Sequence, residues 1–128
     1  MENIEKNRDD SGICFRQALI DMILESWRFM NVFRNAMMKL SLEEQERYKG
    51  RYSWFHRMLN EIAETAGLRI IKINQGETYD IGMAVTALNI EDFQSDDTLI
   101  IEQMIEPIIM EKDSVIRRGS VMLERKGK

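Results

Sequence analysis

The residue types that most often carry enzyme chemistry are scarce in this sequence. His56 is its only histidine and Cys14 its only cysteine, so a Ser–His–Asp or Cys–His set would have to converge on one residue. His56 follows Trp54 and Phe55 in an aromatic helical segment, where a surface or interface histidine is the commoner situation. Arg16 is near Cys14 in sequence, but side chains at this spacing diverge on a helix. We therefore expect a protein that is not an enzyme and needs no cofactor.

An acidic loop is the one segment that could hold a hard cation. Asp92, Asp96 and Asp97 offer carboxylate oxygens there, which are the ligands that Ca²⁺ prefers. The segment lacks the glycine and the spacing of an EF-hand loop, which favours a solvated loop over a calcium site. Cys14 stands in an apolar-periodic stretch, and an unpaired cysteine of this kind indicates a buried thiol in a reducing compartment. The sequence thus predicts no metal site and a cytoplasmic location.

Length and charge exclude several classes of partner. The 128 residues suit one small domain with a helical extension, and the net charge of −4 argues against a general nucleic-acid binder. The basic pairs at 117–118 and 125–126 are too few to follow a nucleic-acid backbone. No apolar run is long enough to cross a membrane, and the polar, acidic start is unlike a signal peptide. We expect neither nucleic acid nor membrane among its partners.

Helical periodicity occupies the first half of the chain. Residues 13–40 contain no Gly or Pro, and large apolar residues recur there at steps of three and four. This pattern predicts one apolar stripe made of Phe15, Leu19, Met22, Ile23, Trp27, Met30, Phe33, Met37 and Leu40. Ser41 followed by Glu44 has the form of a capping box, so a second helix should begin near Leu42. The sequence leaves open whether the two helices form a hairpin or one long kinked rod.

The second half of the chain has the pattern of short strands. Gly67 should end the helix in a left-handed conformation. Strand-like segments follow at 68–73, 83–88, 98–101, 105–110 and 115–123. Pro107 lacks a donor N–H and so belongs at the edge or start of its strand, and residues 111–114 have the composition of a hairpin turn. Helices followed by a small antiparallel sheet predict an α+β fold.

These segments suggest a domain organisation and an oligomeric state. We expect a flexible N-terminus at 1–11, a helical dimerisation region at 12–67, a small β domain at 68–125 and a solvated tail at 126–128. The apolar stripe is larger than one helix can hide against a small sheet, which predicts a homodimeric helical bundle. The expected interface residues are Phe15, Leu19, Met22, Trp27, Met30, Phe33 and Met37.

With the helix end at Gly67, the turn Gly76-Glu77-Thr78-Tyr79-Asp80 and the strand at 115–123, this chain resembles the GrpE family, the nucleotide exchange factors of DnaK-type chaperones. Residues 48–67 look like the family's last helix, which ends in a Gly before the β domain. Gly76-Glu77-Thr78-Tyr79-Asp80 is similar to the family's Gly-Glu-x-Phe-Asp turn, with Ala84-Val85 as its Ala-Val. Residues 115–123 look like its closing hydrophobic-Leu-Arg-x-Ala-x-Val strand. The resemblance covers residues 48–125 and indicates a divergent, shortened relative.

The sequence also departs from the family pattern. Ile81 stands where the family usually has Pro, and the segment from Asp80 to Ala84 is shorter because the family's His-Glu is missing. Glu106-Pro107 replaces the Gly-Tyr of the central hairpin, and the N-terminal coiled coil is much reduced.

The resemblance implies a function. In that family a dimer places one β domain against the nucleotide-binding domain of the chaperone and holds its cleft open, so that ADP leaves. The implied contact residues are Glu77, Tyr79 and Asp80 in the turn and Arg117 and Arg118 in the last strand. One of the two arginines should face solvent by strand alternation. For Tyr79 and Asp80, packing and capping of backbone N–H groups is the alternative role.

Three other functions remain open at this stage. The chain could be an adaptor of a DnaK-like or actin-like ATPase without exchange activity, which the altered turn at 81–83 suggests. It could be an enzyme with a metal in the acidic loop. It could also be a helical dimerisation protein whose small sheet merely caps the bundle.

Overall fold

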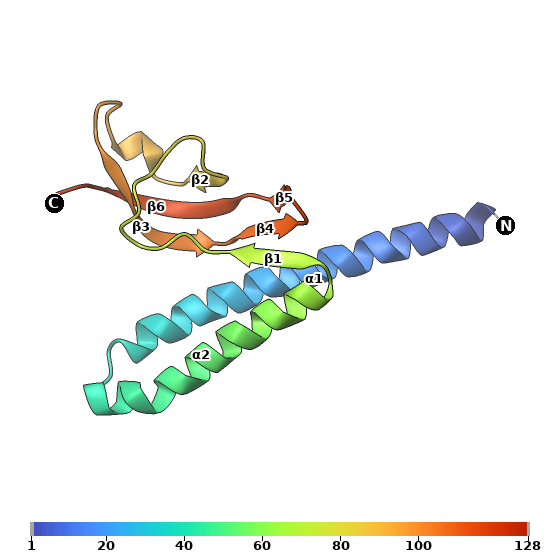
Figure 1. Ribbon diagram of the computed structural model, residues 1–128, viewed down its shortest axis with the longest axis horizontal. Coiled ribbons are helices and arrows are strands. Elements are labelled where there is room, and N and C mark those ends of the chain that lie inside the picture. Colours follow the sequence, from blue (N-terminus) through green and yellow to red (C-terminus); the bar gives the residue numbers. More distant parts are fainter. Residues whose placement is uncertain (1, 128) are drawn as a thin grey trace.

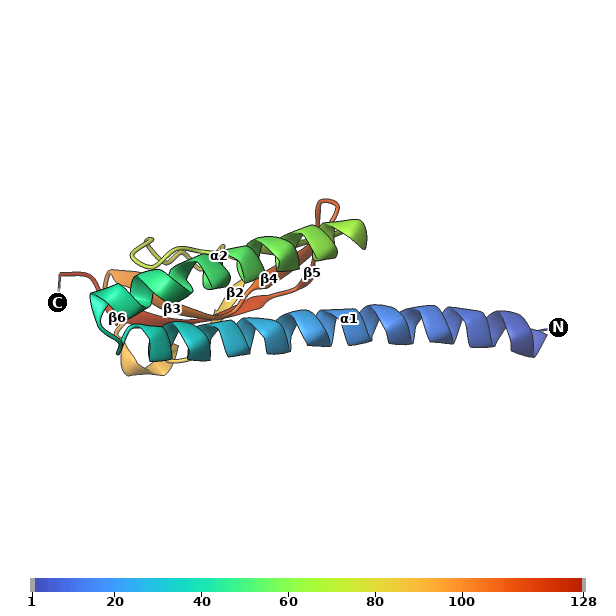
Figure 2. The ribbon, with the colours of Figure 1, turned by 90° about the horizontal axis from the view of Figure 1, so that it is seen from below.

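A helical hairpin lies against a small β domain in the computed structural model (Figure 1). The structure describes the backbone of residues 2–127, and it describes side chains in the range 12–127 with the exception of residue 13. Helix α1 spans Glu2–Met37 and α2 spans Leu42–Thr65. The two helices lie side by side, and α1 continues past the end of α2 toward the N-terminus (Figure 2). The alternative of one long kinked rod is therefore excluded.

Local signals place the ends of α2 where the sequence predicts them. The Ser41 side chain accepts a hydrogen bond from the backbone N–H of Glu44, at 3.3 Å, and the helix begins at Leu42. Gly67 follows the helix with a φ of +78°, a conformation that costs glycine least. The start of α1 differs from the prediction. Its backbone is helical from Glu2, within the segment expected to be flexible, and the side chains of residues 2–11 lie outside the described part.

The β domain consists of two three-stranded sheets. One sheet has the order β1-β4-β5, with β1 at Leu68–Ile71, β4 at Ile108–Glu111 and β5 at Ser114–Arg117. The other has the order β2-β6-β3, with β2 at Val85–Ala87, β6 at Gly119–Arg125 and β3 at Leu99–Glu106. Strand β2 pairs with β6 in parallel, and all other pairs are antiparallel. The α+β class is confirmed, but the expected single antiparallel sheet is wrong.

A bent hairpin connects the two sheets. Its first arm is β3 and β4, interrupted at Pro107, and its second arm is β5 and β6, interrupted at Arg118. The strand expected at 115–123 is therefore two strands in different sheets. Proline lacks the N–H that an unbroken ladder needs, so the bend falls where pairing must lapse. Gly119 lies at the same bend, where a Cβ atom would come within 2.8 Å of the Glu106 carbonyl oxygen.

The hydrophobic core lies between the hairpin and the β domain. Trp27 and Met30 of α1 pack with buried residues of the β2-β6-β3 sheet, among them Ile101 and Val121. A second buried group joins α1 to Ala63 of α2 and to the β1-β4-β5 sheet; it comprises Ile20, Ile23, Leu24, Ala63, Leu68 and Ile109. Because both sheets share their core with α1, the hairpin and the β domain form one packed unit.

Candidate functional site

Helix α1 carries two apolar faces instead of the single predicted stripe. The inner face is buried against α2 and the β domain; it comprises Ile20, Ile23, Leu24, Trp27, Met30 and Met37. Phe15, Met22 and Phe29 are 77%, 68% and 65% exposed, respectively. Each step between these three residues is a heptad, which returns to the same side of a helix that turns about 100° per residue. They form a second, outer face that the chain itself leaves open.

This division changes the expected dimer interface. Trp27, Met30 and Met37 are 4%, 4% and 9% exposed, so they offer little surface to a second chain. Phe15 and Met22 are on the outer face, and Leu19 and Phe33 are partly exposed. Phe29 was not included in the predicted stripe, because Phe29 is not three or four residues away from Trp27 or Met30. Its heptad spacing from Met22 was the signal that could have found it.

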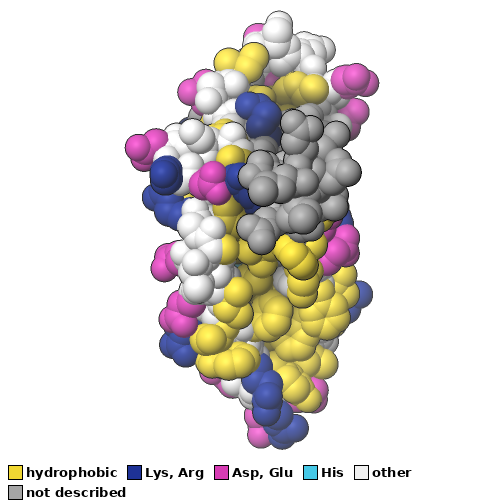
Figure 3. Space-filling view, turned by 90° about the vertical axis from the view of Figure 1, so that its right-hand side faces the viewer, with side chains coloured by type: hydrophobic (Ala, Val, Ile, Leu, Met, Phe, Trp, Pro, Cys, Tyr) yellow, Lys and Arg dark blue, Asp and Glu magenta, His cyan; other side chains and the backbone are white. Residues whose placement is uncertain are grey.

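An apolar groove runs between the two helices beside the outer face. Its volume is about 270 Å³, and it is lined by Phe29, Met30, Phe33, Tyr48, Arg51, Tyr52 and Phe55. Phe33 stacks on Tyr52 with ring centroids 6.3 Å apart, and Tyr48 meets Phe33 edge-on at 6.4 Å. Figure 3 shows hydrophobic side chains gathered over the helical part of the molecule. Contiguous apolar surface of this kind is typical of protein–protein contact.

The turn that resembles the GrpE motif adds to the open edge of β3. Gly76 has a φ of +91° and its N–H donates to the Ile101 carbonyl at 2.8 Å. The Ile101 N–H donates to Glu77, and the Tyr79 N–H donates to Leu99, both at 2.9 Å. These hydrogen bonds fix the backbone of the turn, so its outward side chains have a defined position on the domain surface.

The side chains of this turn divide into inward and outward groups. Tyr79 is half-buried against the core, and Asp80 Oδ1 accepts the Gly82 N–H at 3.1 Å. Tyr79 therefore packs on the core and Asp80 caps a backbone N–H. These are the roles given above as the alternative to contact with a partner. Glu77 is exposed and has no ion-pair partner among the described side chains. Ile81 is 89% exposed. The sequence indicated Ile81 only as a departure from the family's proline.

Arg118 has partners within the chain. Its guanidinium donates to the Val85 carbonyl at 2.7 Å and to the Met83 carbonyl at 3.3 Å. It thereby holds the start of the short strand β2, where few ladder hydrogen bonds are available. Arg118 is exposed, and both hydrogen bonds come from its Nη2 atom. It lies between β5 and β6, so strand alternation does not determine its direction.

Arg117 belongs to an ion cluster around Glu106. The Glu106 carboxylate lies 2.7 Å from an Arg28 nitrogen and 3.5 Å from an Arg117 nitrogen, and it accepts the Ser120 hydroxyl at 3.1 Å. The Glu106 side chain is only 15% exposed, so these contacts are poorly screened by water. Arg28 is on α1 and the others are in the β domain. The cluster therefore ties the helical layer to the sheets.

The acidic loop is organised around Asp97. Its Oδ2 accepts the Gln94 N–H at 2.9 Å and a hydrogen bond from Arg125 Nε at 3.2 Å. The Gln94 N–H, together with the Arg125 guanidinium, lowers the pKa of Asp97 below its ordinary value. Within residues 2–127, no group of three or more His, Cys, Asp or Glu side chains that the structure describes could hold a metal ion.

Cys14 is exposed, so the prediction of a buried thiol is wrong. It lies six residues before Ile20, the first buried residue of α1 among the described side chains.

Comparison with known proteins adds no family. No family model, no curated protein and no solved structure matches this chain. Neither described helix has the length and apolar character that a membrane span requires.

Proposed function

We propose that this protein is a GrpE-like co-chaperone that binds the ATPase domain of a cytoplasmic DnaK-type chaperone and promotes ADP release. The observation that carries the proposal is the turn at 76–81. It presents Glu77 and Ile81 outward from a small β domain whose backbone there is fixed by hydrogen bonds to β3. The surrounding order of elements, a helical hairpin that leads through Gly67 into a two-sheet domain, supports the same assignment.

Exchange of this kind needs contact energy and a stiff support. Moving a two-state cleft from about 1% to about 99% open takes about 5.5 kcal/mol of differential binding. Covering an isoleucine side chain supplies about 1.5–3 kcal/mol, so Ile81, which is 89% exposed, could provide a sizeable part of it. The shared core and the Glu106 cluster hold the β domain rigidly on the helical hairpin. The β domain therefore keeps its position when it pushes the nucleotide cleft open.

The proposal includes a homodimer formed by the outer helical face. Phe15, Met22 and Phe29 have the heptad spacing of a coiled-coil seam, and the inter-helix groove continues this apolar surface. A second copy of the chain is the expected occupant of this face. In a symmetric dimer the same three residues of each chain would be covered by the other chain. Such a dimer leaves the turn at 76–81 free for the ATPase.

A second candidate function is an adaptor that binds a DnaK-like or actin-like ATPase without opening it. The tight Asp80–Gly82 turn favours it, because this short loop brings Ile81 outward where the family has a longer, proline-containing segment. An adaptor would use the same contact residues, and only its effect on the nucleotide would differ.

Release of a fluorescent ADP analogue from a purified DnaK-type ATPase domain tests the proposal. We expect the wild-type chain to accelerate release, and Ile81→Ser and Glu77→Lys to reduce the acceleration at least tenfold. Ile90→Ser and Glu91→Lys are matched controls, since they change exposed residues of the same types elsewhere in the β domain. Binding without faster release would replace exchange by the adaptor function. Absence of binding would refute both.

A further inference from the structure

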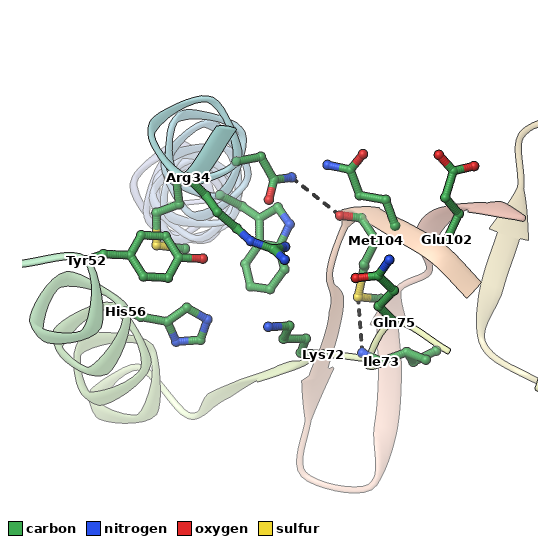
Figure 4. Close-up of a pocket in the computed structure, with 12 residues that line it drawn as sticks. Arg34, Tyr52, His56, Lys72, Ile73, Gln75, Glu102 and Met104 are labelled. Carbon is green, nitrogen blue, oxygen red and sulfur yellow. Dashed lines mark hydrogen bonds between the residues drawn. The ribbon is translucent and has the colours of Figure 1, made fainter. Parts of the chain in front are cut away.

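A cavity of about 80 Å³ with a mixed polar and apolar lining lies between the helices and the β domain (Figure 4). Arg34 of α1, His56 of α2, Lys72 from the segment after β1 and Met104 of β3 are among its lining residues. A water molecule needs about 10–15 Å³ of such space. The cavity therefore has room for several waters or for one small ion with a few waters.

Two cationic side chains converge on this cavity without a carboxylate partner. Arg34 and Lys72 have no Asp or Glu oxygen within 4.0 Å among the described side chains. Figure 4 shows both of them, and the His56 ring, directed toward the same central space. Glu102 also lines the cavity, but its carboxylate points away from the two cations. Both residues are exposed, and an anion between them would be attracted to both charges.

One residue that lines the cavity has an unused hydrogen-bond donor. This residue is Trp27, whose Nε1–H is buried without a hydrogen-bond partner. Buried donors are rarely left unpaired in native proteins. Burial of the ring, followed by the charge of Lys72, lowers the pKa of His56, so its imidazole is neutral at pH 7 and offers no further positive charge to repel the cations.

We propose that this cavity binds a small oxyanion, with inorganic phosphate as its expected occupant, held between the Arg34 guanidinium and the Lys72 ammonium. Guanidinium and ammonium groups are the side chains that bind phosphate most strongly. The volume suits a free ion and excludes a nucleotide base and ribose. Because Arg34 is on α1 and Lys72 follows β1, the bound anion would bridge the helical layer and the β domain and stabilise the fold.

NMR of the isolated chain tests this directly. The ¹H–¹⁵N spectrum has two indole signals, Trp27 and the exposed Trp54, and the chain has a single histidine. Titration with sodium phosphate at constant ionic strength should shift the Trp27 signal saturably and leave the Trp54 signal in place. Phosphate should also raise the pKa of His56, because an anion favours its protonated form against the nearby Arg34 and Lys72.

Variants separate the site from general salt effects. Lys72→Gln should weaken phosphate binding at least tenfold, whereas Lys49→Gln, which removes an exposed charge from α2, should leave it unchanged. Because the volume excludes a base and a ribose, ADP should bind no more tightly than phosphate, and tighter binding of ADP would overturn the assignment to a free ion. Equal shifts with chloride, or an unchanged affinity in Lys72→Gln, would overturn the proposal. No partner ATPase is present, so this outcome is independent of the exchange assay.

Discussion

Phe29→Ala should dissociate the proposed dimer without unfolding the chain. Phe29 is 65% exposed on the outer face of α1, so its side chain contributes little to the core of a single chain. A phenylalanine presents about 150–250 Å² of surface, which leaves about 100–160 Å² of Phe29 available to a partner. At about 25 cal/mol per Å², and allowing for the methyl group that alanine retains, each copy loses about 2–3 kcal/mol.

The symmetry of the dimer doubles this effect. Two copies of Phe29 lose about 4–6 kcal/mol together, which corresponds to a factor of about 10³–10⁴ in Kd. Ordering costs at an interface reduce such area-based values, so we expect a measured weakening of at least about 100-fold. Sedimentation equilibrium over a concentration series measures it, as a shift of the average mass toward the 15.1 kDa monomer.

Two further variants make the result specific. Ile81→Ala removes an exposed apolar side chain from the β domain and should leave the mass distribution unchanged. Trp27→Ala removes a side chain buried within the chain, so it should lower the free energy of unfolding by about 3–5 kcal/mol. Circular dichroism of Phe29→Ala should match the wild type. A wild-type chain that sediments at 15.1 kDa at 100 µM, or a Phe29→Ala dimer as tight as the wild type, would refute the role of the outer face.

Two other predictions concern stability and pH, and both are measured by urea unfolding. Gly119→Ala should destabilise the protein by about 1–3 kcal/mol, because the new Cβ atom would lie 2.8 Å from the Glu106 carbonyl oxygen. Gly50→Ala should instead stabilise α2 by up to about 1 kcal/mol, because a Cβ atom there would have nothing within 4 Å. The folded-state pKa of His56 is lowered from 6.5, so the unfolded chain binds a proton more readily and stability should decline as the pH falls below about 6.5. His56→Gln should flatten this decline between pH 7 and 5; an equally steep decline in the variant would assign it to other groups.

Elements with local signals were predictable from the sequence. The Ser41 cap and the Gly67 terminus each depend on hydrogen bonds and backbone angles within a few residues, and the structure has both where they were expected. The α+β order and the break at Pro107 follow from the same kind of local information. For the proposed functional surface, the sequence indicated the turn at 76–80 and the apolar character of α1, because composition and motif alone identify them.

The partners of individual side chains were decided by the tertiary structure. Arg117 and Arg118 look alike in the sequence, yet one joins the Glu106 cluster and the other holds β2, because the chain changes sheet between them. The apolar residues of α1 predicted one stripe, but packing against both α2 and the sheets buried the row with Trp27 and left Phe15, Met22 and Phe29 open. Periodicity specifies which residues share a helix face. Only the arrangement of the other elements around the helix determines which of its faces is covered.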